Sequence, residues 1–147
     1  MDYRTIVEEI SPCGLDCSRC VYYADGKIRS ASTDLKTMLT GFEKMARNFS
    51  NIEPRLAQYD GFEKVLSFFT EASCKGCRQG SRCIPGCAAH DCVREKNIDF
   101  CFECDEFPCT KNTFQPMLEA KWKSNNQAMK ESGVEAFYND GKKKQRY

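Results

Sequence analysis

The chain has 147 residues, enough for one compact domain, and its 22 basic and 21 acidic residues leave a net charge of +1. This near balance does not favour nucleic-acid binding, which draws on an excess of lysine and arginine. No stretch approaches the length of a membrane span, and the N-terminal segment MDYRTIVEEI has no apolar core of a secretory signal. We therefore expect a cytoplasmic protein with no membrane segment.

Cysteine is the outlier in this composition. A reducing cytoplasm disfavours disulfides, the number of cysteines is odd, and CxxC or CxxxC pairs are better placed to share a metal than to bond elsewhere. We therefore expect all the thiols to be metal ligands. The eleven are Cys13, Cys17, Cys20, Cys74, Cys77, Cys83, Cys87, Cys92, Cys101, Cys104 and Cys109.

Residues 1–30 contain the first cysteine knuckle, CGLDCSRC, from Cys13 to Cys20. The spacing CxxxCxxC is the one that radical-SAM enzymes use to hold a [4Fe-4S] cluster, and it equally suits three zinc ligands. The chain is shorter than the barrel that radical-SAM chemistry requires and lacks an alternating strand and helix pattern. The knuckle is therefore interpreted as part of a metal framework.

Residues 31–72 predict two amphipathic helices. Apolar residues recur every three or four positions from Ser32 to Phe49, and again from Pro54, which suits a first helical turn, to about Ala72. We expect these apolar faces to be buried. They comprise Leu35, Met38, Leu39, Phe42, Met45, Ala46 and Phe49 in the first helix, and Leu56, Tyr59, Phe62, Val65, Leu66 and Phe69 in the second.

Residues 73–110 form a cysteine-rich block with too few large aliphatic residues for a core of its own, so metal is expected to replace the core. The turns CKGC and CFEC each present two sulfurs to one ion. Residues 85–97 predict a short helix that starts near Pro85 and closes at Asn97. On such a helix Cys87 and Cys92 point about 140° apart, toward different metals. His90, the single histidine, is more often an ordinary polar residue than a ligand in this setting, and both alternatives stay open.

Residues 111–147 predict a third helix that starts at Pro116 and carries Leu118, Trp122 and Met129. The pair Ser132-Gly133 breaks it, and VEAFYND forms a final turn or two before the basic tail GKKKQRY. The predicted fold is mostly α, or small α+β: one domain, residues 1–147, with irregular cysteine knuckles stapled by metal ions.

The sequence favours a metal-binding protein with structural zinc, acting as an interaction module for a protein partner. The alternative is an iron-sulfur protein with a [4Fe-4S] cluster that acts in electron transfer or as a sensor. No enzymatic activity is assigned. Carboxylates close to the cysteines are interpreted as capping, solvated or hydrogen-bonded to neighbouring amides; they are Asp16, Glu103, Asp105 and Glu106.

The ordered motifs CGLDCSRC, CKGC, CIPGC and FCFECDEFPC resemble the uncharacterised cysteine-rich family called domain of unknown function 3795. The elements of that family occur in order from Ser11 to Cys109. Two features depart from its pattern: CIPGC has one more residue between its cysteines, and the place of His90 is more often basic. The resemblance implies a zinc or iron-sulfur protein and attaches no reaction to it.

Overall fold

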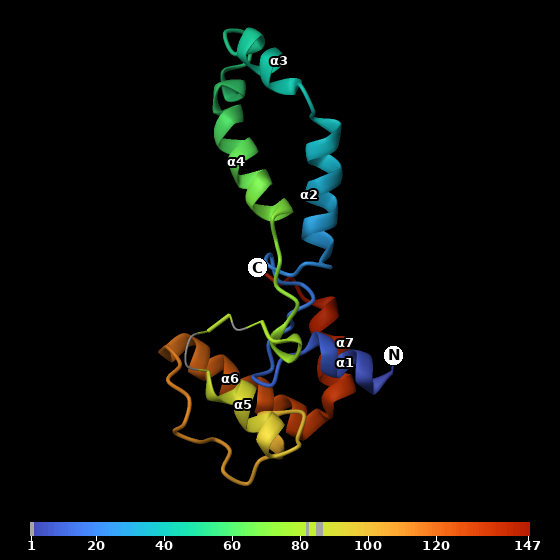
Figure 1. The fold of residues 1–147 in the computed structure, drawn as a ribbon, viewed down its shortest axis with the longest axis vertical. Helices are drawn as coiled ribbons and strands as arrows, with labels where there is room; N and C mark the ends of the chain where they lie inside the picture. The colour runs from blue at the N-terminus through green and yellow to red at the C-terminus, as the bar shows by residue number, and fades with distance from the viewer. Residues whose placement is uncertain (1, 82, 85–86) are drawn as a thin grey trace. The chain divides into compact units, whose positions relative to one another are not determined.

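The structure is a computed structural model that describes residues 2–81, 83–84 and 87–147 (Figure 1). These residues form a mostly α fold, as predicted, and their extended pairings are two isolated bridges, Ile10–Asp16 and Tyr23–Cys74. No helix in the described part of the chain is long and apolar enough to cross a membrane. The helices are α1 (Tyr3–Glu9), α2 (Lys27–Met38), α3 (Phe42–Phe49), η1 (Pro54–Gln58), α4 (Tyr59–Thr70), η2 (Cys77–Gln79), α5 (Ala88–Glu95), η3 (Cys101–Glu103), α6 (Pro116–Ser132) and α7 (Val134–Lys143).

The chain divides into two compact units. Unit 1 comprises Met1–Ser18 and Lys75–Tyr147, and unit 2 comprises Arg19–Cys74. Nine of the eleven cysteines belong to unit 1, and Cys20 and Cys74 belong to unit 2. A single domain stapled by metal stays a prediction.

In unit 2, α2 and α4 pack along each other, and α3 and η1 lie in the connection between them (Figure 1). The helix expected over Ser32–Phe49 is two helices, because Gly41 adopts the left-handed conformation with φ of 81° and interrupts it. The first of them also begins earlier than expected, at Lys27. Pro54 opens the next helical segment as predicted, although its first turn is a 3₁₀-helix.

The expected burial of the apolar faces in unit 2 is wrong for most of their side chains. Ala46 and Leu66 are buried, whereas Met38 is 75% exposed. Unit 2 is a helical hairpin, and no second layer within unit 2 covers its apolar faces. Helical periodicity therefore identifies these faces but does not show that they are buried. The other exposed members of the two faces are Leu35, Met45, Phe49, Phe62 and Val65.

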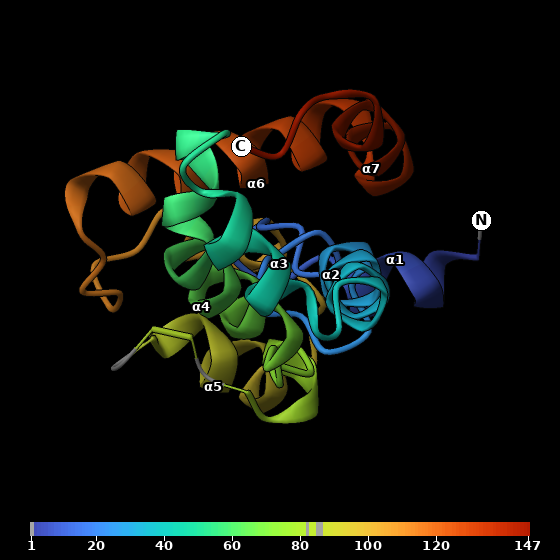
Figure 2. The ribbon, with the colours of Figure 1, turned by 90° about the horizontal axis from the view of Figure 1, so that it is seen from above.

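In unit 1, α6 begins at Pro116 and ends at Gly133, whose φ is 85°, as the sequence predicts. Helix α7 follows at once and packs against α6 (Figure 2), and it runs to Lys143, further than expected. Helix α5 closes at Asn97, which has the predicted left-handed φ of 51°. Pro85 lies outside the described residues.

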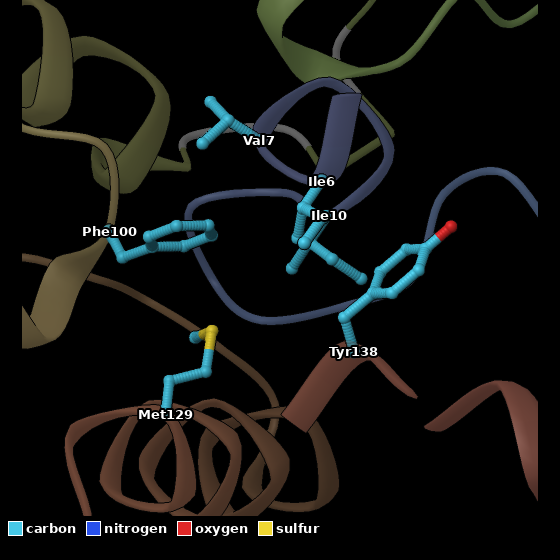
Figure 3. Packing of buried hydrophobic residues seen from close by; sticks show 6 residues of the cluster. All are labelled: Ile6, Val7, Ile10, Phe100, Met129 and Tyr138. Carbon is cyan, nitrogen blue, oxygen red and sulfur yellow. The ribbon is translucent and has the colours of Figure 1, made fainter. Parts of the chain in front are cut away.

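A compact apolar cluster joins α1, α6 and α7 with the residues before η3. Figure 3 shows Met129 extending from α6 toward Phe100. The Arg78 guanidinium covers the Phe100 ring at 5.2 Å and donates hydrogen bonds to the carbonyls of Val7 and Asp99. Because Arg78 follows Cys77 directly, this contact ties the CKGC turn to the core. The cluster comprises Ile6, Val7, Ile10, Phe100, Met129 and Tyr138.

Candidate metal centre

The loop CGLDC is held by hydrogen bonds of its own. The Ser11 amide donates to the Leu15 carbonyl at 2.9 Å, the Leu15 amide donates to Ser11 Oγ at 3.0 Å, and that hydroxyl lies 3.1 Å from Cys13 Sγ. Gly14 has a φ of 82°, and a Cβ there would lie 2.5 Å from Asn125 Cβ on α6. This position therefore requires glycine both for its backbone conformation and for the close approach of α6.

Two adjacent asparagines on α6 fix both cysteine loops. Asn126 is fully buried: its side chain accepts from the Phe102 amide at 3.0 Å and donates to the Pro12 carbonyl at 3.4 Å. Asn125 donates to the Gly14 carbonyl at 2.9 Å. The sequence analysis missed this clasp. Its available signal was a pair of poor helix formers in the middle of an otherwise regular helix.

Four thiols belong to the apolar cluster that contains Trp122, and we call them the Trp122 group. Cys13 is 5% exposed and Cys101 8%, and burial raises the pKa of these thiols to about 11 and about 12. The indole N–H of Trp122 makes no hydrogen bond of standard geometry with the described residues, but it lies close enough to Cys101 to favour its thiolate. The group comprises Cys13, Cys87, Cys101 and Cys109.

A second set of four thiols, the cavity group, lines a cavity of about 20 Å³ beneath α5. Lys96 and Lys111 also line it, and Lys96 Nζ lies 3.0 Å from Cys104 Sγ, which lowers the pKa of that thiol. Glu106 contacts both lysines, at 3.3 Å and 2.6 Å. The cavity group comprises Cys92, Cys101, Cys104 and Cys109.

The Cys77 group consists of Cys17, Cys77 and Cys83, which are in thiol contact. Hydrogen bonding with the Cys77 thiol lowers the pKa of Cys17 to about 7 and that of Cys83 to about 6. The pKa of Cys77 itself is raised, because the two sulfurs hold its proton.

The thiols of these groups do not point toward a common centre. Among the residues that the structure describes, no three or more Cys, His, Asp or Glu side chains form a group arranged to hold a metal ion. In unit 2, Cys74 pairs with the segment after Cys20: its amide donates to the Tyr22 carbonyl and its carbonyl accepts from the Ala24 amide, both at 2.8 Å. Cys87 precedes the first residue of α5, Ala88, so the angle expected between Cys87 and Cys92 on a common helix does not apply, and their service to different metals stays a prediction.

His90 and the carboxylates near the cysteines have structural contacts. His90 is buried: its Nδ1 lies 2.8 Å from Asp91 Oδ1, and its Nε2 has no hydrogen-bond partner among the described residues. Asp16 accepts from Ser18 Oγ at 2.7 Å. Glu103 accepts from the Asp99 amide at 3.1 Å. These carboxylates therefore serve to fix the loops.

A family model described as "Protein of unknown function (DUF3795)" matches residues 9–114. Since the match covers well over half of the chain and includes all eleven cysteines, the chain belongs to this family, as its motifs predicted. No curated protein and no solved structure matches the chain significantly.

Proposed function

We propose that this member of the DUF3795 family binds a zinc ion at the cavity group and that the ion holds the cysteine-rich segment of unit 1 together. The main support is the cavity of about 20 Å³ that all four thiols of the group line. A cavity of this size has room for about one water-sized atom, so it suits a single ion better than a cluster of several atoms. Four thiolates are a standard ligand set for structural zinc.

The charges around the cavity also suit such a site. Four thiolates and one Zn²⁺ carry a formal charge of about −2. Lys96, Lys111 and Glu106 line the same cavity, so their net charge of +1 offsets part of this charge, and Lys96 already donates to Cys104 Sγ. Hydrogen bonds from outside the ligand set orient metal-bound sulfurs and tune their basicity.

Zinc binding at this group requires its thiols to turn toward one point. Sulfurs that surround one zinc ion at about 2.3 Å stand ~3.8 Å apart in a tetrahedron. The described residues have no such convergent group. Each cysteine has alternative staggered χ1 rotamers, through which the thiols would close on the ion.

The zinc proposal is tested by the metal content of ligand variants. Cys92→Ser and Cys104→Ser should each lower bound zinc by about one ion per chain, because removing one of four thiolates weakens a tetrahedral site. Glu95→Ser, on the exposed side of α5, is the control and should retain the zinc of the wild type. Elemental analysis after gel filtration measures the difference. Undiminished zinc in both cysteine variants would refute the assignment.

A second candidate is an iron-sulfur protein, and a specific observation favours it. Cys13 and Cys17 are separated by three residues yet belong to different groups, and so do Cys83 and Cys87. In two-cluster ferredoxins the final C-x₃-C step likewise connects ligands of two different clusters. The Trp122 group and the Cys77 group would then hold neighbouring clusters. Because the Trp122 group shares Cys101 and Cys109 with the cavity group, the two assignments compete.

The two candidates differ in colour and in sulfide. Protein purified without air would be brown and contain iron and acid-labile sulfide if clusters are present, and colourless with zinc if the cavity group is a zinc site. Cys87→Ser separates them further, since Cys87 belongs to the Trp122 group and not to the cavity group. Loss of iron in this variant would support clusters, whereas retained zinc would support the cavity group.

A further inference from the structure

An open cleft of about 610 Å³ lies on unit 1 beside the first turns of α6. Its volume falls within the ~300–1,000 Å³ that small-molecule sites occupy. The described residues that line it include no carboxylate, and one thiol, Cys83 of the Cys77 group, lines it. Its apolar lining comprises Leu15, Ile84, Met117 and Leu118.

Two cations without an acidic partner face this cleft. Neither Lys121 nor Arg146 forms an ion pair with a described residue, whereas Lys123, two residues along α6, contacts Glu119 at 2.6 Å. The Nε of Arg146 is buried and has no hydrogen-bond partner in the part of the chain that the structure describes. The guanidinium also lies 5.2 Å from the centroid of the Tyr147 ring. It offers a carboxylate a fork of N–H donors, and an acceptor that reaches the unpartnered Nε would remove the cost of a buried donor.

We propose that the cleft binds a small organic anion with an apolar body, of the class of an aromatic carboxylate. The carboxylate would accept charge-assisted hydrogen bonds from Arg146 and Lys121, while the apolar lining removes the rest of the ligand from water. The N-terminal end of α6 adds a favourable potential for the negative charge. This site goes beyond the proposed zinc binding, because none of the four thiols of the cavity group lines the cleft.

The charge requirement is tested with two probes of the same shape, 2-naphthoate and neutral 2-naphthamide, titrated into the full chain as purified with its metal. Naphthoate should bind saturably, with an affinity at least about tenfold higher than that of naphthamide. A tenfold ratio of affinities corresponds to a difference of ~1.4 kcal/mol in binding free energy. The double variant Lys121→Gln and Arg146→Gln should abolish this preference. Lys123→Gln, the ion-paired neighbour, should leave it intact.

The place of binding is tested on the wild type alone, so a poorly folded variant does not compromise the result. With ¹³C-methyl methionine, naphthoate should shift the signal of Met117, which lines the cleft and is 78% exposed. Met38 and Met45 are exposed controls in unit 2 and should not shift. Equal affinity for both probes, no saturable binding, or shifts at Met38 and Met45 in place of Met117 would overturn the proposal.

Discussion

Gly14 links the cysteine loop to the helix that supports it. Its φ of 82° belongs to the left-handed region, and the space for a Cβ is taken by Asn125. The sequence shows a glycine between two cysteines, which indicates a turn. The second reason for it, the contact with α6, depends on a residue 111 positions away and has no local signal.

Replacing Gly14 with alanine should destabilise the protein by two separable effects. The left-handed conformation alone costs an alanine ~1 kcal/mol, and the overlap with Asn125 Cβ at 2.5 Å adds a further ~1–3 kcal/mol. Gly80→Ala measures the first effect alone, because Gly80 has a φ of 89° and a Cβ there would meet no described residue within 4 Å apart from its chain neighbours. Urea unfolding of the two variants gives the difference. Equal losses would show that α6 does not approach this loop closely.

Asn126 and its neighbour Asn125 form a matched pair for the clasp. Asn126→Ala leaves the Phe102 amide and the Pro12 carbonyl buried without their partner, so we expect a loss of ~2–3 kcal/mol in the free energy of unfolding. Asn125→Ala removes one hydrogen bond at a half-buried site and should cost ~1 kcal/mol. Denaturation curves test the order. A larger loss at Asn125 would contradict the central role of Asn126.

At the scale of elements, α7 is held to α1 by a polar contact. Glu9 accepts from Tyr138 Oη at 2.8 Å and from Lys142 Nζ at 2.7 Å, and Lys142 also contacts Asp16 at 3.1 Å. Burial raises the pKa of Glu9, but the hydrogen bonds from Lys142 and Tyr138 outweigh it and place this pKa below its ordinary value of 4.5. The ionised form of Glu9 therefore stabilises the fold.

This contact predicts a pH dependence of stability. A carboxyl whose pKa is lowered on folding stabilises the protein above the unfolded pKa, and the contribution is lost as pH falls through the folded pKa. The wild type should thus lose more unfolding free energy than Glu9→Gln between about pH 6 and about pH 3. Glu8→Gln, an exposed neighbour on α1, is the control and should follow the wild type. Parallel curves for all three proteins would exclude the contribution of Glu9.

The helix ends that the sequence predicted correctly lie at proline, glycine or asparagine residues. Pro116 fixes its own φ, whereas Gly133 and Asn97 readily adopt the positive φ at which a helix closes, and all three begin or end helices where expected. The sequence did not predict that Gly41 interrupts the first helix of unit 2. Glycine can either continue or end a helix, and the apolar period runs through this position unchanged. Helical period shows that an apolar face exists, but not whether the fold covers it.

For the candidate site, the sequence identifies the thiols but not their partners. Spacing predicts that Cys101 and Cys104 share a site, and both line the cavity of about 20 Å³. It does not predict that Cys13 joins the Trp122 group and Cys17 the Cys77 group, although the Ser11 side chain is a hydrogen-bond partner of both thiols. Helix α6 decides which thiols lie together, because it places Trp122 and Asn126 against loops from both ends of unit 1.

At the scale of the whole molecule, the two units differ in the apolar surface that they bury. The buried side chains of unit 2 are small or few, with Leu66 the largest apolar one among the described residues. Unit 1 buries Trp122, Phe100 and Met129. The exposed apolar side chains of α2 and α4 suit the protein partner expected from the sequence, which stays a prediction.

Unequal burial predicts unequal protection from hydrogen exchange. The amides of α2 and α4 should exchange much faster than those of α6 around Trp122 and Met129, because regions with few buried apolar contacts open at lower free energy. Mass spectrometry of the exchanging protein, followed peptide by peptide, measures both units in one sample. Comparable protection of α4 and α6 would show that the apolar face of unit 2 is covered.

The central claim is that thiolates of unit 1 bind metal as a four-sulfur zinc site. X-ray absorption at the zinc edge, recorded on protein purified without air, tests it most directly. We predict about four sulfur neighbours of zinc at ~2.3 Å, and Cys104→Ser should lower the number of zinc-bound sulfurs. Zinc-free protein, or zinc surrounded by oxygen and nitrogen, would contradict the claim.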